Sequence, residues 1–216
     1  MSAKVDKALN RLKTILPLKD RQEQCSAPIK ELHQNVLRSF VTRGRILSRE
    51  EMAQYVDNLE EAIRVLTSHD MVVLSENGDP IGAYPFTMEA REHKVRVNGR
   101  QVYAMCALDA LAVSPMFETK TQVNSICRIT GDPVTIEQSG KTIENLDESG
   151  DIHFGIIWGA ASDGACVADS LCMEMMFLLD NTVANQWLAE DLDNREIFTL
   201  PEAVEFGARF FVPLMS

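Results

Sequence analysis

Apolar residues recur at helical spacing through the first part of the chain. In residues 1–26 basic and apolar positions are interleaved, which predicts an amphipathic helix or a loosely docked arm with a break near Pro17. In residues 29–40 the apolar positions lie three and four residues apart, and this pattern stops at Gly44. The first segment of the chain is therefore expected to be helical.

Two shorter helices and a hairpin are expected next. A capping signal, in which Ser or Asn precedes Glu by three residues, opens each helix: Ser48 with Glu51, and Asn58 with Glu61. Residues 71–74 and 81–84 then flank Asn77-Gly78, a pair typical of a tight turn between two strands. Three helices followed by a two-stranded wing is the order of a winged helix, so we predict such a module over residues 27–85.

The pattern changes near residue 86, where short strands alternate with turns. Residues 104–113 predict an apolar helix that Ser114-Pro115 closes, because proline disfavours the helical conformation at the residue before it. Asn98-Gly99 predicts a second hairpin. The other expected elements are strands at 122–128, 134–138, 152–158 and 172–178, helices at 182–190 and 201–211, and a polar loop at 140–151.

The charge of the chain argues against a nucleic acid as partner. With 21 basic and 32 acidic residues, the 216-residue chain has a formal net charge of -11. The predicted third helix and wing also carry more acidic than basic residues. A phosphate backbone repels such a surface. The predicted winged-helix module is therefore expected to pack against the rest of the chain rather than to bind DNA.

The expected compartment is the cytosol. The chain contains no run of about 18 apolar residues that could cross a membrane. Residues 1–21 also lack the continuous apolar stretch of a signal peptide. The five cysteines are then expected to stay reduced, and their odd number fits free thiols better than a disulfide framework.

Common catalytic motifs are missing from the sequence, and one pair of residues remains that could carry out chemistry. There is no Walker-type loop, G-x-S-x-G, H-E-x-x-H or C-x-x-C, and the four histidines are scattered. Cys106 and Asp109 lie three residues apart on the predicted apolar helix and therefore share a face. The helix dipole near the first turn favours the thiolate of Cys106. The alternative is that Cys106 packs in the core while Asp109 meets solvent or an arginine.

The other cysteines show weaker patterns. Cys172 opens a predicted apolar strand, where a lone cysteine is usually inert packing. Cys127 lies at the end of a predicted strand and is expected to be structural. Cys25 and Cys166 have no surrounding pattern, so no role is assigned to either.

Three cysteine-containing segments nevertheless occur in an informative order. They are Tyr103-Ala-Met-Cys-Ala-Leu-Asp-Ala-Leu111, Cys127-Arg-Ile-Thr-Gly-Asp-Pro-Val134, and Ser170-Leu-Cys172 followed by an apolar strand. Together with the preceding hairpin Gly78-Asp-Pro-Ile-Gly-Ala-Tyr84, they make the sequence resemble the alkylmercury lyase (organomercurial lyase) family. The resemblance spans roughly residues 28–211 and is sharpest over 78–178.

The resemblance implies a fold of the α+β class. In it, a winged-helix-like N-terminal module is followed by a C-terminal α/β domain of small antiparallel sheets with flanking helices. The chain would then divide into an N-terminal helix or arm over residues 1–26, a winged-helix-like domain over 27–85, and an alkylmercury-lyase-like catalytic domain over 86–216.

The resemblance also implies the site. By motif, the catalytic residues of the family fall on Cys106, Asp109 and Cys172, which would also hold the Hg(II) product, and its structural cysteine falls on Cys127. Two positions depart from the family pattern: Met105 stands where a tryptophan is common, and Met173 stands where some relatives carry another cysteine. Neither position belongs to the three reacting groups, so the activity is supported while the substrate preference stays open.

The implied reaction is protonolysis of the carbon–mercury bond of an organomercurial substrate, giving a hydrocarbon and Hg(II), in mercury resistance and detoxification. No organic cofactor is expected. An external thiol would be needed for turnover, and the Hg(II) would pass to low-molecular-weight thiols or to a mercuric reductase. Two alternatives remain: a thiol-based soft-metal binding or sensing protein on the same scaffold without lyase activity, and a regulator that uses the N-terminal module. The leading hypothesis requires sulfurs from two distant segments to converge beside a sheltered acid.

Overall fold

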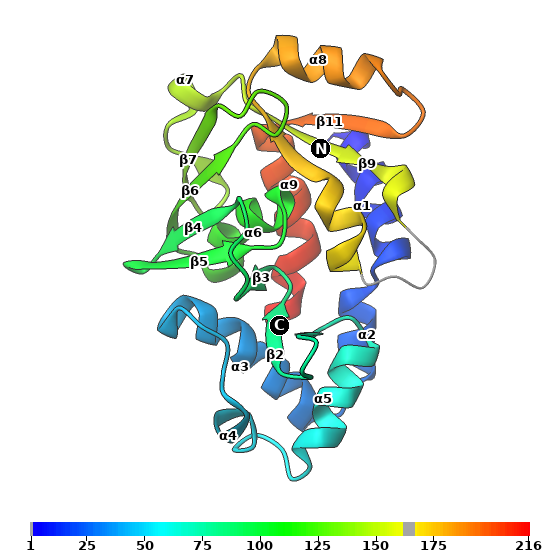
Figure 1. Cartoon of the computed structure of the whole chain (residues 1–216), viewed down its shortest axis with the longest axis vertical. Helices are drawn as coiled ribbons and strands as arrows, with labels where there is room; N and C mark the ends of the chain where they lie inside the picture. Colours follow the sequence, from blue (N-terminus) through cyan, green and yellow to red (C-terminus); the bar gives the residue numbers. More distant parts are fainter. Residues whose placement is uncertain (1, 162–166) are drawn as a thin grey trace.

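The computed structural model describes residues 2–161 and 167–216. The helices are α1 (Ala3–Ile15), α2 (Leu18–Gln24), α3 (Ala27–Arg43), α4 (Arg49–Met52), α5 (Leu59–Ser68), α6 (Ala107–Phe117), α7 (Leu146–Ser149), α8 (Asn181–Ala189) and α9 (Leu200–Phe211). The strands are β1 (Val73–Leu74), β2 (Pro80–Ala83), β3 (Phe86–Thr87), β4 (Lys94–Val97), β5 (Arg100–Ala104), β6 (Lys120–Ile126), β7 (Pro133–Ser139), β8 (Thr142–Ile143), β9 (His153–Ile157), β10 (Met175–Leu178) and β11 (Arg195–Thr199). Helices α2 to α5 gather at one end of the long axis and α8 lies at the other (Figure 1).

The short helices near the N-terminus begin at the predicted caps. The hydroxyl of Ser48 accepts a hydrogen bond from the N–H of Glu51 at 3.3 Å, and the Glu51 carboxylate accepts one from the N–H of Ser48 at 2.7 Å. At the start of α5, the side chain of Asn58 accepts a hydrogen bond from the N–H of Glu61 at 3.1 Å. Helix α3 ends at Gly44, whose φ of 74° lies in the left-handed region that suits glycine.

The N-terminal segment forms helices rather than a loose arm. Helix α1 packs against α9, and the carboxylate of Asp6 accepts a hydrogen bond from Arg209 at 2.6 Å. The guanidinium of Arg11 stacks over the ring of Trp158 at 4.7 Å. Pro17 separates α1 from α2, as predicted. Among the described helices none has the length and apolar character needed to cross a membrane.

The predicted winged helix is not confirmed. Strands β1 and β2 do pair around the Asn77-Gly78 turn, but β2 continues through β3 to β5 in one eight-stranded sheet. Phe40 of α3 stacks on Phe86 of β3 with ring centroids 4.8 Å apart, and both belong to one hydrophobic core. The expected wing is therefore the edge of a larger sheet, and the division of the chain near residue 85 stays a prediction.

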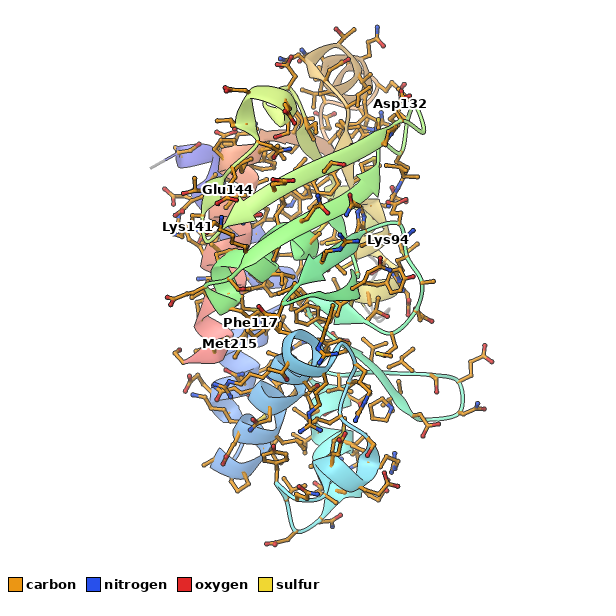
Figure 2. All side chains as sticks on the ribbon, turned by 90° about the vertical axis from the view of Figure 1, so that its left-hand side faces the viewer. Lys94, Phe117, Asp132, Lys141, Glu144 and Met215 are labelled. Atoms are coloured by element: carbon orange, nitrogen blue, oxygen red, sulfur yellow. The ribbon has the colours of Figure 1, made fainter. Side chains whose placement is uncertain are left out.

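The main sheet is antiparallel, with the strand order β1-β2-β3-β5-β4-β6-β7-β8. Asn98 and Gly99 join β4 to β5, and their positive φ angles of 48° and 73° suit a two-residue hairpin. Side chains of β4, β6 and β7 alternate between a buried and a more exposed face. Figure 2 shows these strands broadside, with Lys94 of β4 labelled on the exposed face. The mixed helical and antiparallel class is as expected.

Helix α6 is buried on all sides behind this sheet. Every residue from 107 to 116 is buried, which explains why the helix is apolar around its whole circumference. Helix α9 covers it closely, because Gly207 has no side chain: a Cβ there would lie 3.2 Å from the carbonyl oxygen of Leu108 and 3.3 Å from Cβ of Ala112. This enclosed helix begins directly after Cys106.

Pro115 does not close α6, contrary to the prediction. The helix continues to Phe117, although proline has no N–H to donate to the carbonyl of Leu111. The side-chain amide of Gln138 on β7 donates to that carbonyl instead, at 2.9 Å. A residue far along the chain thus supplies the hydrogen bond that proline removes, and local sequence rules could not reveal it.

Three further elements differ from the prediction. Cys172 lies in a short 3-10 turn (Leu171–Glu174) before β10 rather than in the strand itself. The expected polar loop at 140–151 contains β8 and α7. Strand β11 was not predicted, because three of its five residues are polar, yet it pairs with β9 in a three-stranded sheet of order β10-β9-β11.

We expect Gln138→Leu to lower the free energy of unfolding by about 1–3 kcal/mol, because the carbonyl of Leu111 then stays buried without a donor. Pro115→Ala restores a backbone N–H at that point of α6. The same Gln138 substitution should therefore cost less in a Pro115→Ala background. Urea unfolding of the wild type, both single variants and the double variant measures this difference. Equal losses in the two backgrounds would show that Gln138 does not replace the missing donor.

Candidate active site

Cys106 lies at the junction of β5 and α6. It is the N-cap residue of the helix, with an extended backbone at φ −149° and ψ 177°. Its Sγ accepts a hydrogen bond from the backbone N–H of Asp109 at 3.4 Å. The sequence predicted a helix from residue 104 with Cys106 inside its first turn. That boundary was wrong, because β5 extends to Ala104 and the helix begins at Ala107.

Asp109 occupies the third position of α6, next to Cys106. The side chains of both residues lie in the core, each 1% exposed. Asp109 therefore does not meet solvent, and no ion pair to it is found among the described residues. Its Oδ2 atom is buried without a hydrogen-bond partner in the described part of the chain. A buried acid in this condition is rare in a purely structural role.

Cys172 reaches the same place from a distant part of the sequence. It lies in the 3-10 turn before β10, and β10 packs against α6. The two Sγ atoms and a carboxylate oxygen of Asp109 all lie within 4.8 Å of one another, and all three residues are buried. Among the Cys, His, Asp and Glu side chains of residues 2–161 and 167–216, these three lie close enough together to share a metal ion. The structure thus brings together the three residues that the resemblance selects.

Burial controls the protonation of Asp109. Desolvation disfavours the ionised carboxylate and raises its pKa from 3.8 to about 7. Hydrogen bonds with the side chain and backbone of Cys106 and the positive charge of Arg91 oppose this rise but do not cancel it. The carboxyl can therefore both accept and release a proton near neutral pH.

Burial also controls the two thiols. It raises the pKa of Cys106 well above its usual value, and the hydrogen bond with Cys172 and the charge of Asp109 act in the same direction. The hydrogen bond from Cys106 lowers the pKa of Cys172, but burial and Asp109 outweigh it, so this pKa is also raised. The expectation that the helix dipole favours the thiolate of Cys106 was wrong, because desolvation dominates in this enclosed site.

Arg128, which the sequence analysis did not single out, holds the turn that carries Cys172. Its guanidinium donates to the carbonyl of Met173 and to the carboxylate of Glu92, the latter at 2.5 Å. Its backbone N–H donates to the carbonyl of Phe177 in β10 at 3.3 Å. The only sequence signal was its position directly after Cys127 in the second motif.

Arg91 holds the other end of the same segment. It donates to the carbonyl of Ala168 at 3.3 Å, lies 3.7 Å from the carboxylate of Asp169, and contacts Sδ of Met173 at 3.1 Å. Arg91 also pairs with the carboxylate of Glu89 at 3.0 Å, but no local pattern marked it, because its contacts with the segment that carries Cys172 lie more than 70 residues further along the chain.

An open hollow of about 610 Å³ lies beside this turn. Its lining includes Arg91 and Arg128, together with the residues next to the two cysteines, Met105 and Met173. Met105 is buried, and its Cε lies so close to β2 that a Cβ at Gly82 would be only 2.7 Å from it. Met173 is 45% exposed. The hollow thus borders both cysteine-bearing segments.

The other cysteines lie apart from the group of Cys106, Asp109 and Cys172. Cys127 is fully buried, and its backbone forms an isolated bridge with Phe177, which agrees with a structural role. Cys25 is half-buried, and its Sγ lies 3.8 Å from Nδ1 of His69. Cys166, to which no role was assigned, lies outside the described residues.

Comparison with known proteins places the site in a family. The alkylmercury lyase family model matches residues 86–212, which is more than half of the chain. The chain belongs to the alkylmercury lyase family. The alkylmercury lyase of Bacillus cereus is 26% identical over 172 residues, covering 79% of this chain and 77% of that protein. The alkylmercury lyase of Pseudomonas putida is 28% identical over 153 residues, covering 70% of each. The prediction of an enzyme is confirmed.

A solved structure also resembles this member of the alkylmercury lyase family. The crystal structure of the mercury-bound form of MerB2 has a TM-score of 0.73 against this chain at 18% sequence identity. The match covers 92% of this chain and 98% of that chain. At this identity the likeness shows the fold, and it confirms the mixed helical and antiparallel architecture.

Asp109→Asn is expected to stabilise the protein increasingly as the pH rises. The pKa of Asp109 is about 7 in the folded state and about 3.9 in an unfolded chain, so between pH 4 and pH 7 the carboxyl ionises in the unfolded chain while it stays mostly protonated in the folded one, and the free energy of unfolding falls progressively. A neutral amide of similar shape avoids this loss. We expect the variant to exceed the wild type in free energy of unfolding by on the order of 3 kcal/mol at pH 8 and by little at pH 4. Denaturant titration at both pH values measures this, and equal stability at pH 8 would contradict the buried-acid interpretation.

Arg128→Ala is expected to loosen the turn that carries Cys172. Alkylation of Cys172 by a small thiol-reactive reagent should become about tenfold faster, because the charged hydrogen bond that holds the turn is lost. Cys106, which is fixed at the end of α6, should react at its wild-type rate. Mass spectrometry of the labelled peptides gives both rates. Arg96→Ala, at an exposed position of β4, is the control, and an unchanged Cys172 rate in Arg128→Ala would refute the proposed restraint.

Proposed function

We propose that this chain is an organomercurial lyase that cleaves the carbon–mercury bond by protonolysis, giving a hydrocarbon and Hg(II). The observation that carries the proposal is the convergence of two thiols and one acid, Cys106, Cys172 and Asp109, in a buried site. Membership of the alkylmercury lyase family supports the substrate class. In this proposal the two sulfurs bind mercury, and Asp109 moves the proton.

Capture of the substrate begins with a thiol. Mercury(II) is a soft cation, and sulfur is the ligand that such ions select. An organomercurial R–Hg–X forms a sulfur–mercury bond with Cys106 or Cys172, and the thiol releases its proton. This release occurs even though burial raises the pKa of both thiols, because a coordinated thiol is deprotonated. The carboxylate of Asp109, within 4.8 Å of both sulfurs, is placed to accept that proton.

The second thiol and the protonated Asp109 complete the reaction. The second thiol loses its proton, which leaves with X⁻ as HX, and its sulfur then adds electron density to mercury and weakens the bond of mercury to carbon. Asp109 then gives its proton to the carbon as a general acid, and the electron pair of the carbon–mercury bond becomes the new C–H bond. In total, R–Hg–X and two thiols give R–H, a bis-thiolate of Hg(II) and HX. The pKa of about 7 suits an acid that must hold a proton and then release it.

Release of Hg(II) requires a competing ligand. The product stays bound to Cys106 and Cys172 until another thiol displaces it by exchange. We propose that low-molecular-weight thiols or a mercuric reductase receive the ion in the cytosol, where thiols stay reduced. None of these steps uses an organic cofactor. The pathway as a whole would detoxify organomercurials.

The hollow bordered by Met105 and Met173 is the proposed approach for the substrate. Each of the three reacting groups is at most 3% exposed, so the substrate must pass residues that lie between them and solvent. Met105 and Met173 line the hollow and directly adjoin Cys106 and Cys172 in sequence. Both positions depart from the common family pattern, so the range of organic groups accepted is expected to depend on them.

Replacing any of the three reacting groups should severely reduce hydrocarbon release. Cys106→Ser and Cys172→Ser each remove a soft ligand, so release of benzene from phenylmercury should fall below detection. Asp109→Asn removes the proton donor and should lower the rate by about 10²–10⁴-fold. Gas chromatography of the headspace, with excess thiol present, measures the release. Cys25→Ser, at a half-buried cysteine outside the site, is the control and should retain wild-type turnover.

The same measurement separates the proposal from a soft-metal binding or sensing protein. An enzyme releases more than one equivalent of hydrocarbon per protein when excess thiol removes the Hg(II). A binding protein releases no hydrocarbon, whatever its affinity for mercury. Full turnover by Cys106→Ser would show that the roles assigned to the two sulfurs are wrong.

A further inference from the structure

Met175 places a third sulfur beside the two thiols. Its Sδ lies 3.5 Å from Sγ of Cys106, and its side chain is 2% exposed. Cys106 is thus in contact with a thioether and lies within 4.8 Å of the thiol of Cys172. A thioether has no proton to lose and donates a lone pair to soft metals. The site therefore offers mercury three sulfur atoms.

The strand that carries Met175 directs it toward the site. Successive side chains of β10 alternate between its two faces. Met175 belongs to the main core, together with Cys106 and Cys172. Its neighbour Met176 belongs to a separate cluster with Trp187 of α8. The two residues share one strand and one chemistry but lie on opposite faces, so they form a matched pair for experiment.

We propose that Met175 is a third sulfur ligand of mercury, in addition to the thiolates of Cys106 and Cys172. This inference rests on the function proposed above. The lone pair of the thioether forms the bond to mercury. No bond within Met175 breaks, and no proton or electron is transferred. Because the side chain is buried, water competes little for the coordination position that Met175 fills.

A third sulfur donor affects two stages of the reaction. It adds electron density to the bound organomercurial and so weakens the carbon–mercury bond further. It also holds the Hg(II) product through one more contact, which slows its removal by an external thiol. Met175 thereby sets how strongly the product is retained, whereas proton transfer remains with Asp109.

Mercury L-edge X-ray absorption of the Hg(II)-loaded protein, freed of excess thiol, tests the coordination directly. We expect two short sulfur distances and one longer distance in the wild type. Met175→Leu, which keeps the size and apolar character of the side chain, should show only the two short distances. Met176→Leu should retain all three. The absorption band from sulfur-to-mercury charge transfer should change in Met175→Leu alone.

Competition with dithiothreitol tests the consequence for retention. Met175→Leu should lose Hg(II) about tenfold more readily than the wild type. Even residues that only contact a metal ligand change the affinity for the metal by about 10–100-fold. Met176→Leu should match the wild type. Equal retention by the wild type and a folded Met175→Leu overturns the proposal.

A finding of only two sulfur neighbours in the loaded wild type also overturns the proposal, and this measurement needs no variant to fold. Failure of the proposed function has a different signature, namely no hydrocarbon from the wild type at any thiol concentration. The number of sulfur neighbours in the loaded protein does not depend on that result. The two hypotheses can therefore fail separately.

Discussion

Desolvation of the Asp109 carboxyl is the constraint on which the site depends. Removing an ionised carboxylate from water is unfavourable by several kcal/mol unless partners compensate, and Oδ2 of Asp109 has none among the described residues. The surroundings maintain this condition, because α6 is covered by the main sheet on one side and by α9 on another. An amphipathic helix would have exposed an acid at this position or paired it with a base. A helix that is apolar all round raises the pKa of this carboxyl to about 7, so that near neutral pH it can accept a proton and give it up again, as the proposed reaction requires.

The same desolvation gives the thiols an unusual resting state. Reactive cysteines commonly lie in electropositive surroundings that favour the thiolate, whereas burial and Asp109 raise the pKa of both Cys106 and Cys172. A metal ion must therefore displace the thiol protons itself. Soft cations form sulfur bonds strong enough to do so, while hard cations prefer oxygen ligands. In the proposed reaction, enclosure therefore favours soft metals, and it keeps the thiols in their less nucleophilic, protonated form until such a metal binds.

Short-range patterns predicted the parts of the fold that depend on neighbouring residues. The caps at Ser48 and Asn58, the end of α3 at Gly44 and the adjacency of Cys106 and Asp109 all follow from spacings of three or four residues. Contacts between distant segments could not be predicted in this way. Gln138 on β7 donates the hydrogen bond that allows α6 to continue beyond Pro115. The turn that carries Cys172 is restrained by Arg91 and Arg128. Met175 on β10 contacts Cys106, although the two segments share no local pattern. The convergence of Cys172 with Cys106 was expected only from the family resemblance, because a lone cysteine beside an apolar strand is usually an inert core residue.

The fold holds its sulfurs in two different ways. Cys106 and Asp109 belong to one helix end and are joined by a hydrogen bond, so the first sulfur and the proton carrier keep a fixed relation. Cys172 and Met175 belong to a turn and strand that are held by arginine side chains and by packing against α6. In the proposed reaction, a metal bound to sulfurs from both sides therefore links two structural units, the start of α6 and residues 171–178, that also pack against each other in one core. Because such a ligand binds only when the two units are assembled, it stabilises the folded state. The tight product complex of the proposed reaction follows from this geometry, and so does its need for an external thiol to complete the cycle.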